Sequence, residues 1–138
     1  MIRSHKIVMA AGCFDVLHVG HVKHLKAAKA LGDYLVVALT KDSHVNKGPR
    51  RPVFNERQRE EMLRELKCVD QIILVESTAE ALRIVSPDIF VKGSDYKTRI
   101  QPEHRAYCEQ MEIEIAFTNE PQFSSTDLLH YYDRSQPR

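Results

Sequence analysis

Short apolar runs that alternate with helix-like segments constrain the fold of this chain more than any other feature. The runs occupy residues 7–11, 34–40, 71–75, 89–91 and 113–117. Continuous apolar runs of this length are typical of strands buried on both faces, as in parallel sheets. Helices are predicted over residues 19–31, 55–66, 78–85, 102–111 and 125–131, with Gly32 as the C-terminal stop of the first.

This alternation predicts an α/β fold: a Rossmann-like open parallel five-stranded sheet with helices on both faces. Ligands of such sheets bind beyond the carboxyl ends of the strands. We therefore expect a site in the loops that follow Ala11, Thr40, Val91 and Phe117.

Length and charge limit the classes of partner. The 138 residues fit a single domain, 1–138, and 20 basic against 19 acidic residues leave a net charge of +1. No overall positive field favours nucleic acid or an anionic membrane, so any anion must be met locally. The 3 cysteines lack a CxxC spacing, which argues against a disulfide framework or structural zinc. No run approaches the roughly 20 apolar residues of a membrane span. A cytoplasmic protein is expected.

The loop after the first apolar run reads GCFDVLHVGH over residues 12–21. His18 and His21 lie three residues apart, and Gly20 permits a close backbone approach. The following helix would offer unpaired N–H groups and a partial positive charge at its start, which suits phosphate. A surface histidine pair and two ligands of a zinc site remain alternatives, although no third ligand follows at a suitable spacing.

These residues resemble the G-x-F-D-x-x-H-x-G-H signature of the cytidylyltransferase-like nucleotidyltransferases. The resemblance covers nearly the whole chain, through GDYLVVA at 32–38, KG at 47–48, RPV at 51–53, ERQR at 56–59, KGSDY at 92–96 and SST at 124–126. Within that family it is closest to the heptose-1-phosphate adenylyltransferase domain, chiefly through KGSDY, and next to glycerol-3-phosphate cytidylyltransferases.

The resemblance implies the HxGH nucleotidyltransferase fold and transfer of a nucleotidyl group from a nucleoside triphosphate to the phosphate of a phosphorylated sugar. ATP is favoured, Mg²⁺ is expected with the triphosphate, and a homodimer is implied. One alternative is a CTP-dependent enzyme acting on glycerol-3-phosphate or an amino-alcohol phosphate. Another is a nucleotide-binding module without catalysis, because residues 119–123 lack the arginine and glycine of related cytidylyltransferases.

The resemblance also implies roles for individual residues. The catalytic set is His18, His21, Lys47 and Arg59. The nucleotide-binding set is Gly12, Cys13, Phe14, Gly20, Lys92, Gly93, Asp95, Ser124, Ser125 and Thr126. The acceptor-binding set is Lys23, Asp42, Arg50 and Arg51, and no protein side chain is assigned to a metal. Simpler roles stay open: a solvated basic loop around Lys47, an ion pair of Arg59 with Glu56, a turn built on Asp95 and a plain helix cap at Ser124 or Ser125.

Overall fold

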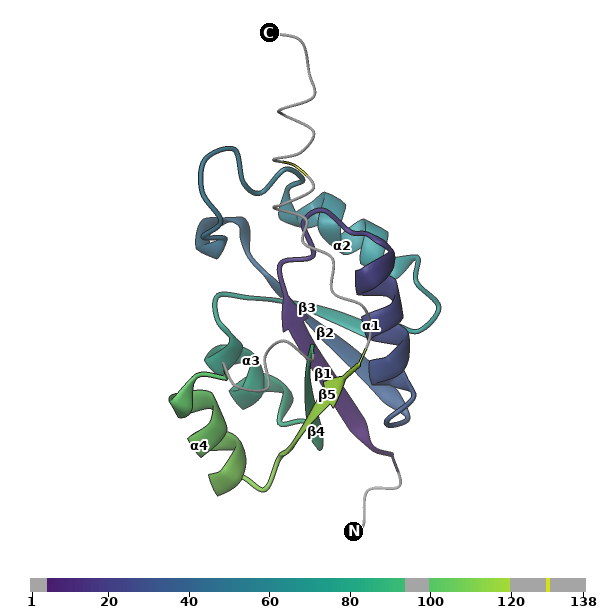
Figure 1. Ribbon diagram of the computed structural model, residues 1–138, viewed down its shortest axis with the longest axis vertical. Helices are drawn as coiled ribbons and strands as arrows, with labels where there is room; N and C mark the ends of the chain where they lie inside the picture. The colour runs from purple at the N-terminus through teal and green to yellow at the C-terminus, as the bar shows by residue number, and fades with distance from the viewer. Residues whose placement is uncertain (1–4, 94–99, 120–128, 130–138) are drawn as a thin grey trace, which may run out of the picture.

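A computed structural model describes residues 5–93, 100–119 and 129. The strands are β1 (Ile7–Gly12), β2 (Tyr34–Thr40), β3 (Gln71–Val75), β4 (Ile89–Gly93) and β5 (Glu114–Thr118). The helices of the described ranges are α1 (Val19–Lys29), α2 (Glu56–Arg64), α3 (Thr78–Val85) and α4 (Pro102–Gln110), with a 3₁₀ turn, η1, at Asp42–His44. All strand pairs are parallel, in the order β3-β2-β1-β4-β5 (Figure 1). The predicted fold class is confirmed.

Side chains of the central strand alternate between two cores. Val8 and Ala10 join the core that Leu25 of α1 and Leu63 of α2 cover. Met9 joins the opposite core, beneath α3 and α4. Figure 1 shows this layering, with α1 and α2 on one side of the sheet and α3 and α4 on the other. Burial on both faces explains why the strands appear in the sequence as continuous apolar runs.

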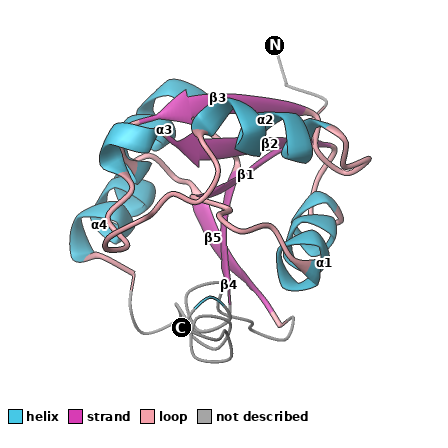
Figure 2. Ribbon diagram, turned by 90° about the horizontal axis from the view of Figure 1, so that it is seen from above, coloured by secondary structure: helices cyan, strands magenta, loops and turns pink. Residues whose placement is uncertain are grey.

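The strand order places a switch point at β1. From β1 the chain moves outward to β2 and β3, then returns to pair β4 with β1 on the other side (Figure 2). The carboxyl ends of β1 and β4 therefore flank the crevice in which open α/β sheets bind ligands. Gly12 ends β1, and Gly93 ends β4 in register with Thr118 of β5.

Gly32 has a different role from the one expected. Helix α1 ends at Lys29 with Ala30 as its C-cap, so Gly32 does not stop the helix. A Cβ at Gly32 would instead lie 2.6 Å from a Val8 methyl group and 2.8 Å from the Lys6 carbonyl oxygen. Glycine is required there because the connection to β2 crosses directly over the start of β1.

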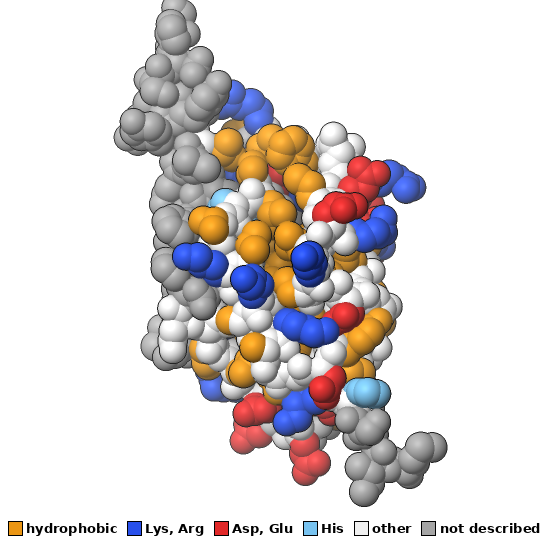
Figure 3. Space-filling view, turned by 90° about the vertical axis from the view of Figure 1, so that its right-hand side faces the viewer, with side chains coloured by type: hydrophobic (Ala, Val, Ile, Leu, Met, Phe, Trp, Pro, Cys, Tyr) orange, Lys and Arg blue, Asp and Glu red, His pale blue; other side chains and the backbone are white. Residues whose placement is uncertain are grey.

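The surface over α1 and α2 carries charge of both signs. Figure 3 views this side and shows lysine and arginine side chains interleaved with apolar and acidic ones. Within the described ranges, no helix has the length and apolar character that crossing a membrane requires. The predicted helix 125–131 falls outside the described residues except for Leu129.

Candidate active site

Two histidines form the start of α1, and we call residues 18–21 the histidine turn. His18 is the N-cap, and its Nδ1 accepts the N–H of Gly20 at 3.0 Å. His21 reaches back, and its Nδ1 accepts the N–H of His18 at 3.2 Å. The two rings stack with centroids 3.9 Å apart and an interplanar angle of 21°. This is a capping box in which imidazoles replace the usual hydroxyl and carboxylate.

The capping box determines which ring nitrogen of each histidine carries the proton. Because each Nδ1 accepts a backbone N–H, the neutral form of each ring carries its proton on Nε2. Burial, together with the charges of His18, His24 and Lys47, lowers the pKa of His21 to about 4. At neutral pH His21 is therefore an uncharged Nε2–H donor.

The expected phosphate contact through backbone N–H groups stays a prediction, but two of the N–H groups at this turn are engaged. The N–H groups of His18 and Gly20 are already bonded to the imidazoles of this turn. Gly20 itself is buried. The ring Nε2–H groups are further donors of this turn, and the helix supplies its partial positive charge behind them.

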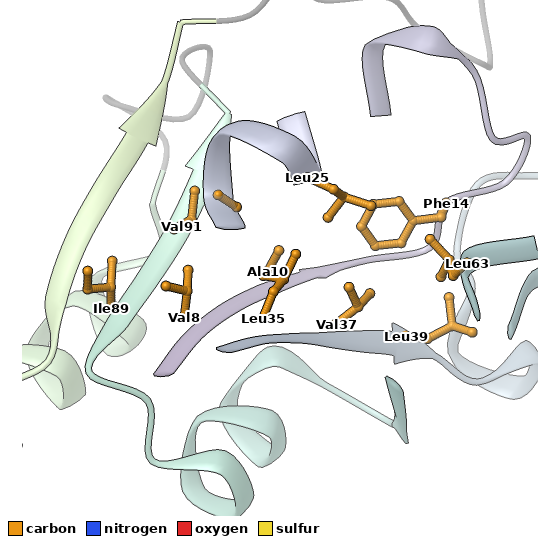
Figure 4. Close-up of a cluster of buried hydrophobic side chains, with 11 residues drawn as sticks. Val8, Ala10, Phe14, Leu25, Leu35, Val37, Leu39, Leu63, Ile89 and Val91 are labelled. Carbon is orange, nitrogen blue, oxygen red and sulfur yellow. The ribbon is translucent and has the colours of Figure 1, made fainter. Parts of the chain in front are cut away.

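Phe14 supports the histidine turn from the core. Its ring is buried between Leu25 and Leu63 (Figure 4), and it meets His21 edge-on with centroids 5.3 Å apart. A Cβ at Gly12 would lie 3.2 Å from the Phe14 ring, so the strand end has little room for a side chain. Gly12 and Phe14 therefore place the histidine turn at the carboxyl end of β1.

Arg59 is the most completely buried charged residue near the site, with 0% of its surface exposed. Its Nε donates to the Phe54 carbonyl at 2.9 Å, and Nη1 donates to the carbonyls of Cys13 and Thr40, each at 2.9 Å. Nη2 pairs with Asp42 Oδ1 at 2.6 Å. The guanidinium thus joins the loops that follow β1 and β2 to the start of α2.

Asp15 and Arg51 make a second buried connection between these loops. Asp15 is 2% exposed and accepts the N–H groups of Val53 at 2.7 Å and Phe54 at 3.0 Å. Arg51 Nε donates to Asp15 Oδ2 at 3.0 Å, and Nη2 donates to the Asp15 carbonyl. Burial alone raises the pKa of Asp15, but the hydrogen bonds from Phe54, Val53 and Arg51 outweigh it and lower the pKa.

Residues 43–50 lie between these two buried connections, and we call them the basic loop. Lys47 and Arg50 are exposed, and Gly48 turns the chain at φ +100° with open space around it. The charge of Lys47 reaches His21 and contributes to lowering its pKa. Lys23 is exposed on α1, one turn beyond Val19.

The end of β4 presents its lysine to the other side of the sheet. Lys92 Nζ lies 5.5 Å from the centroid of the Phe90 ring, and Phe90 belongs to the core beneath α3 and α4. Burial lowers the pKa of His104 on α4, and the charge of Lys92 lowers it further. Asp95, Ser124, Ser125 and Thr126 lie outside the described residues.

A family model described as cytidylyltransferase-like matches residues 9–130. The chain belongs to the cytidylyltransferase-like family. Two relatives called Bifunctional protein HldE, from Helicobacter pylori (strain HPAG1) and Citrifermentans bemidjiense, are 42% and 45% identical over 121 and 98 residues. These alignments cover 83% and 68% of this chain but only 26% and 20% of the relatives. The chain therefore spans about a quarter or less of their length.

Two solved structures are also similar to this cytidylyltransferase-like chain. The lipopolysaccharide core biosynthesis protein from Thermoplasma volcanium GSS1 is 33% identical, with a TM-score of 0.73 over 86% of this chain and 99% of that chain. A protein with unknown function from Archaeoglobus fulgidus is 16% identical, with a TM-score of 0.61 over 83% of this chain and 89% of that chain. The second likeness shows the fold alone.

In this cytidylyltransferase-like chain the structure brings His18 and His21 together with Phe14, and the charge of Lys47 acts on His21. Arg59, Asp42 and Arg51 are instead engaged with the protein's own loops. The expected Glu56 partner of Arg59 accepts the Asp42 N–H at 2.8 Å. Phosphate or acceptor contact by Arg59, Asp42 and Arg51 stays a prediction.

Sequence reasoning assigned no role to Asp15, His24 or Thr118. The signal for Asp15 was present, as the acidic residue of the GCFD signature, but its Val53 and Phe54 partners are 38 and 39 residues away. His24 and Thr118 are 94 residues apart, and no local pattern connects them.

A resident metal does not fit the described part of this chain. No three His, Cys, Asp or Glu side chains gather there as a metal-binding group. The nearest buried carboxylate, Asp15, is paired with Arg51, and Asp42 is paired with Arg59. The remaining donors around His21 are imidazoles and an amine, which suit anions better than Mg²⁺.

Proposed function

We propose that this chain is a nucleotidyltransferase that transfers a nucleotidyl group from a nucleoside triphosphate to the phosphate of a phosphorylated sugar. The observation that carries the proposal is the pair of stacked histidines, held as Nε2–H donors at the carboxyl end of β1, with the charge of Lys47 acting on His21. Membership of the cytidylyltransferase-like family and the HldE relatives support it.

In the proposed reaction an acceptor phosphate oxygen attacks the α-phosphorus. The bond from that phosphorus to the bridging oxygen breaks, and pyrophosphate leaves with the electron pair. The protein supplies no nucleophile, so its work is positioning and charge neutralisation. His18 and His21 donate Nε2–H hydrogen bonds to the phosphate oxygens, and the Lys47 ammonium balances charge that develops toward pyrophosphate.

A neutral His21 stacked on His18 suits this task. Two cationic rings 3.9 Å apart would repel one another, whereas an uncharged His21 stacks on His18 without that repulsion. The rigid capping box holds the donors before the substrate arrives, so little reorganisation is needed in the transition state. Mg²⁺ would enter with the triphosphate and neutralise part of its charge.

The acceptor is proposed to be a heptose-1-phosphate or a related sugar-1-phosphate, with ATP as the donor. The resemblance of KGSDY at 92–96 and the HldE relatives favour this choice over glycerol-3-phosphate or an amino-alcohol phosphate with CTP. A homodimer stays an expectation from the family, and sedimentation of the same preparation tests it.

Pyrophosphate release with a panel of substrates tests the proposal. The purified chain is incubated with Mg²⁺, with ATP or CTP, and with heptose-1-phosphate, glucose-1-phosphate, glycerol-3-phosphate or phosphoethanolamine. We expect release with ATP and a sugar-1-phosphate. Release with CTP and glycerol-3-phosphate or phosphoethanolamine would replace the substrate assignment. Nucleotide binding without release under every condition would identify a binding module and overturn the catalytic proposal.

A further inference from the structure

A polar bridge connects α1 to the end of β5. His24 Nδ1 lies 2.8 Å from Thr118 Oγ1. His24 follows His21 by one helical turn, and Thr118 is the last residue of β5 with 4% of its surface exposed. A hydroxyl buried to this degree requires a hydrogen-bond partner, and the imidazole supplies one.

The position of this bridge connects two halves of the candidate site. α1 carries the histidine turn, and Thr118 pairs with Gly93, the last residue of β4. β4 and β5 lie on the far side of the switch point from β2. The segments predicted to bind the nucleotide, around Asp95 and Ser124, begin just beyond these two strand ends.

The core contacts of α1 are apolar, through Leu25 and Ala28, and its directional contact with Asp70, made by Lys29, lies at the end of the helix away from the histidine turn. Apolar contacts are not directional, so by themselves they tolerate small shifts of a helix along a sheet. A hydrogen bond from the helix to one strand end restricts such shifts. The bridge is thus suited to keep the histidines at a constant distance from the ends of β4 and β5.

We propose that His24 and Thr118 are positioning residues that set the spacing between the histidine turn and the ends of β4 and β5, and thereby the affinity for a nucleoside triphosphate. This inference rests on the proposed function. A threonine hydroxyl both donates and accepts, so it bonds Nδ1 whichever way the imidazole is protonated.

Substitutions at both ends of the bridge test it. Thr118→Val and His24→Leu each remove the hydrogen bond and put an apolar side chain of similar size in place of the polar one. A net hydrogen bond contributes about 1 kcal/mol, so each change should raise the KM for MgATP about fivefold and leave kcat within about twofold. The double variant should be no worse than either single one, because both remove the same bond. Thr118→Ser and His24→Asn keep a hydroxyl and an Nδ1-like group, and should restore the wild-type KM.

A second readout is independent of turnover. Imidazole ¹⁵N–¹H NMR spectra of the free protein should show shifted His18 and His21 resonances in Thr118→Val and wild-type resonances in Thr118→Ser. If the wild-type chain shows no nucleotidyl transfer, the proposed function fails while these spectra still test the bridge. Unchanged His18 and His21 resonances in Thr118→Val, with only the free energy of unfolding reduced, would overturn the positioning role. An unchanged KM in an active enzyme would overturn it equally.

Discussion

His21 is surrounded by features that disfavour a proton. Its ring is partly buried, it stacks on His18, and Lys47 and His24 lie near enough to act on its charge. Its Nδ1 is occupied as an acceptor for a backbone N–H, and protonation would destroy that bond. The residue therefore works as a neutral donor over a wide pH range.

The first prediction concerns this titration. In an NMR titration, the His21 ring should show a midpoint of about 4, against the ordinary 6.5, because burial and the nearby positive charges oppose protonation. His5, which is exposed, serves as the internal comparison. A His21 midpoint near 6.5 would contradict the described environment.

Arg59 provides the second prediction. Lysine keeps the charge but has no planar fork, so Arg59→Lys should leave some of the Cys13, Thr40 and Phe54 carbonyls without a donor. We expect the free energy of unfolding in urea to fall by about 2–3 kcal/mol. The control is Arg57→Lys, at an exposed position of the same helix, which should change it by less than about 0.5 kcal/mol. Equal effects of the two substitutions would refute the structural role of Arg59.

Helix α1 combines its cap and its candidate chemistry in the same side chains. The Nδ1 atoms of His18 and His21 stabilise the helix start, while their Nε2 atoms carry the donors of the site. A helix whose capping residues also have a proposed catalytic role cannot lose them without some loss of stability. Suitable substitutions separate the two roles.

The third prediction uses asparagine for that separation. In His18→Asn the new amide oxygen would lie where His18 Nδ1 accepts the Gly20 N–H, because asparagine is a favoured N-cap residue. His18→Asn should therefore lower turnover by about 10²–10³-fold through loss of one Nε2–H donor, with stability within about 0.5 kcal/mol of wild type. His18→Ala should show the same loss of turnover and a further loss of about 1 kcal/mol in stability. Full activity in His18→Asn would exclude the donor role.

At the scale of the whole molecule, the shifted pKa values make stability depend on pH. The pKa of His21 is lower in the folded chain than in the unfolded one, so between pH 6.5 and about 4 only the unfolded chain gains this proton. Stability then falls as the pH decreases through that window. His104 acts in the same direction. The pKa of Asp15 is also lowered, so its contribution is lost only below its ordinary value of 3.8.

The fourth prediction follows from this pH dependence of stability. The free energy of unfolding, measured in urea at about pH 7, 6, 5 and 4, should decrease with each step below pH 6.5. In His21→Gln, which keeps an N3 side chain able to complete the capping box, the slope should be smaller. The same slope in both proteins would show that His21 does not titrate as described.

The fold could be predicted from the sequence because each strand of a parallel sheet is buried on both faces and therefore appears as a short apolar run of its own. Five apolar runs predict five strands buried on both faces. The first and last residues of every strand lie within two residues of the predicted ones. The histidine turn was likewise contained in one short stretch. Hydrogen bonds such as that between Arg59 and Cys13, which are 46 residues apart, form only when loops from several strands come together. No periodic pattern in the sequence predicts such long-range contacts. Gly32 was misassigned because its constraint is the distant Val8 side chain.

The two buried connections around the basic loop have a consequence for how this scaffold could diversify. Asp42 precedes the loop and is held by Arg59, while Arg51 follows it and is held by Asp15. Residues 43–50 therefore leave and re-enter the protein at two anchored points, and their own length and sequence carry little of the fold. Such a segment can be exchanged without disturbing the sheet: grafting a different loop that keeps Lys47 between Asp42 and Arg51 is a direct route to a changed choice of acceptor.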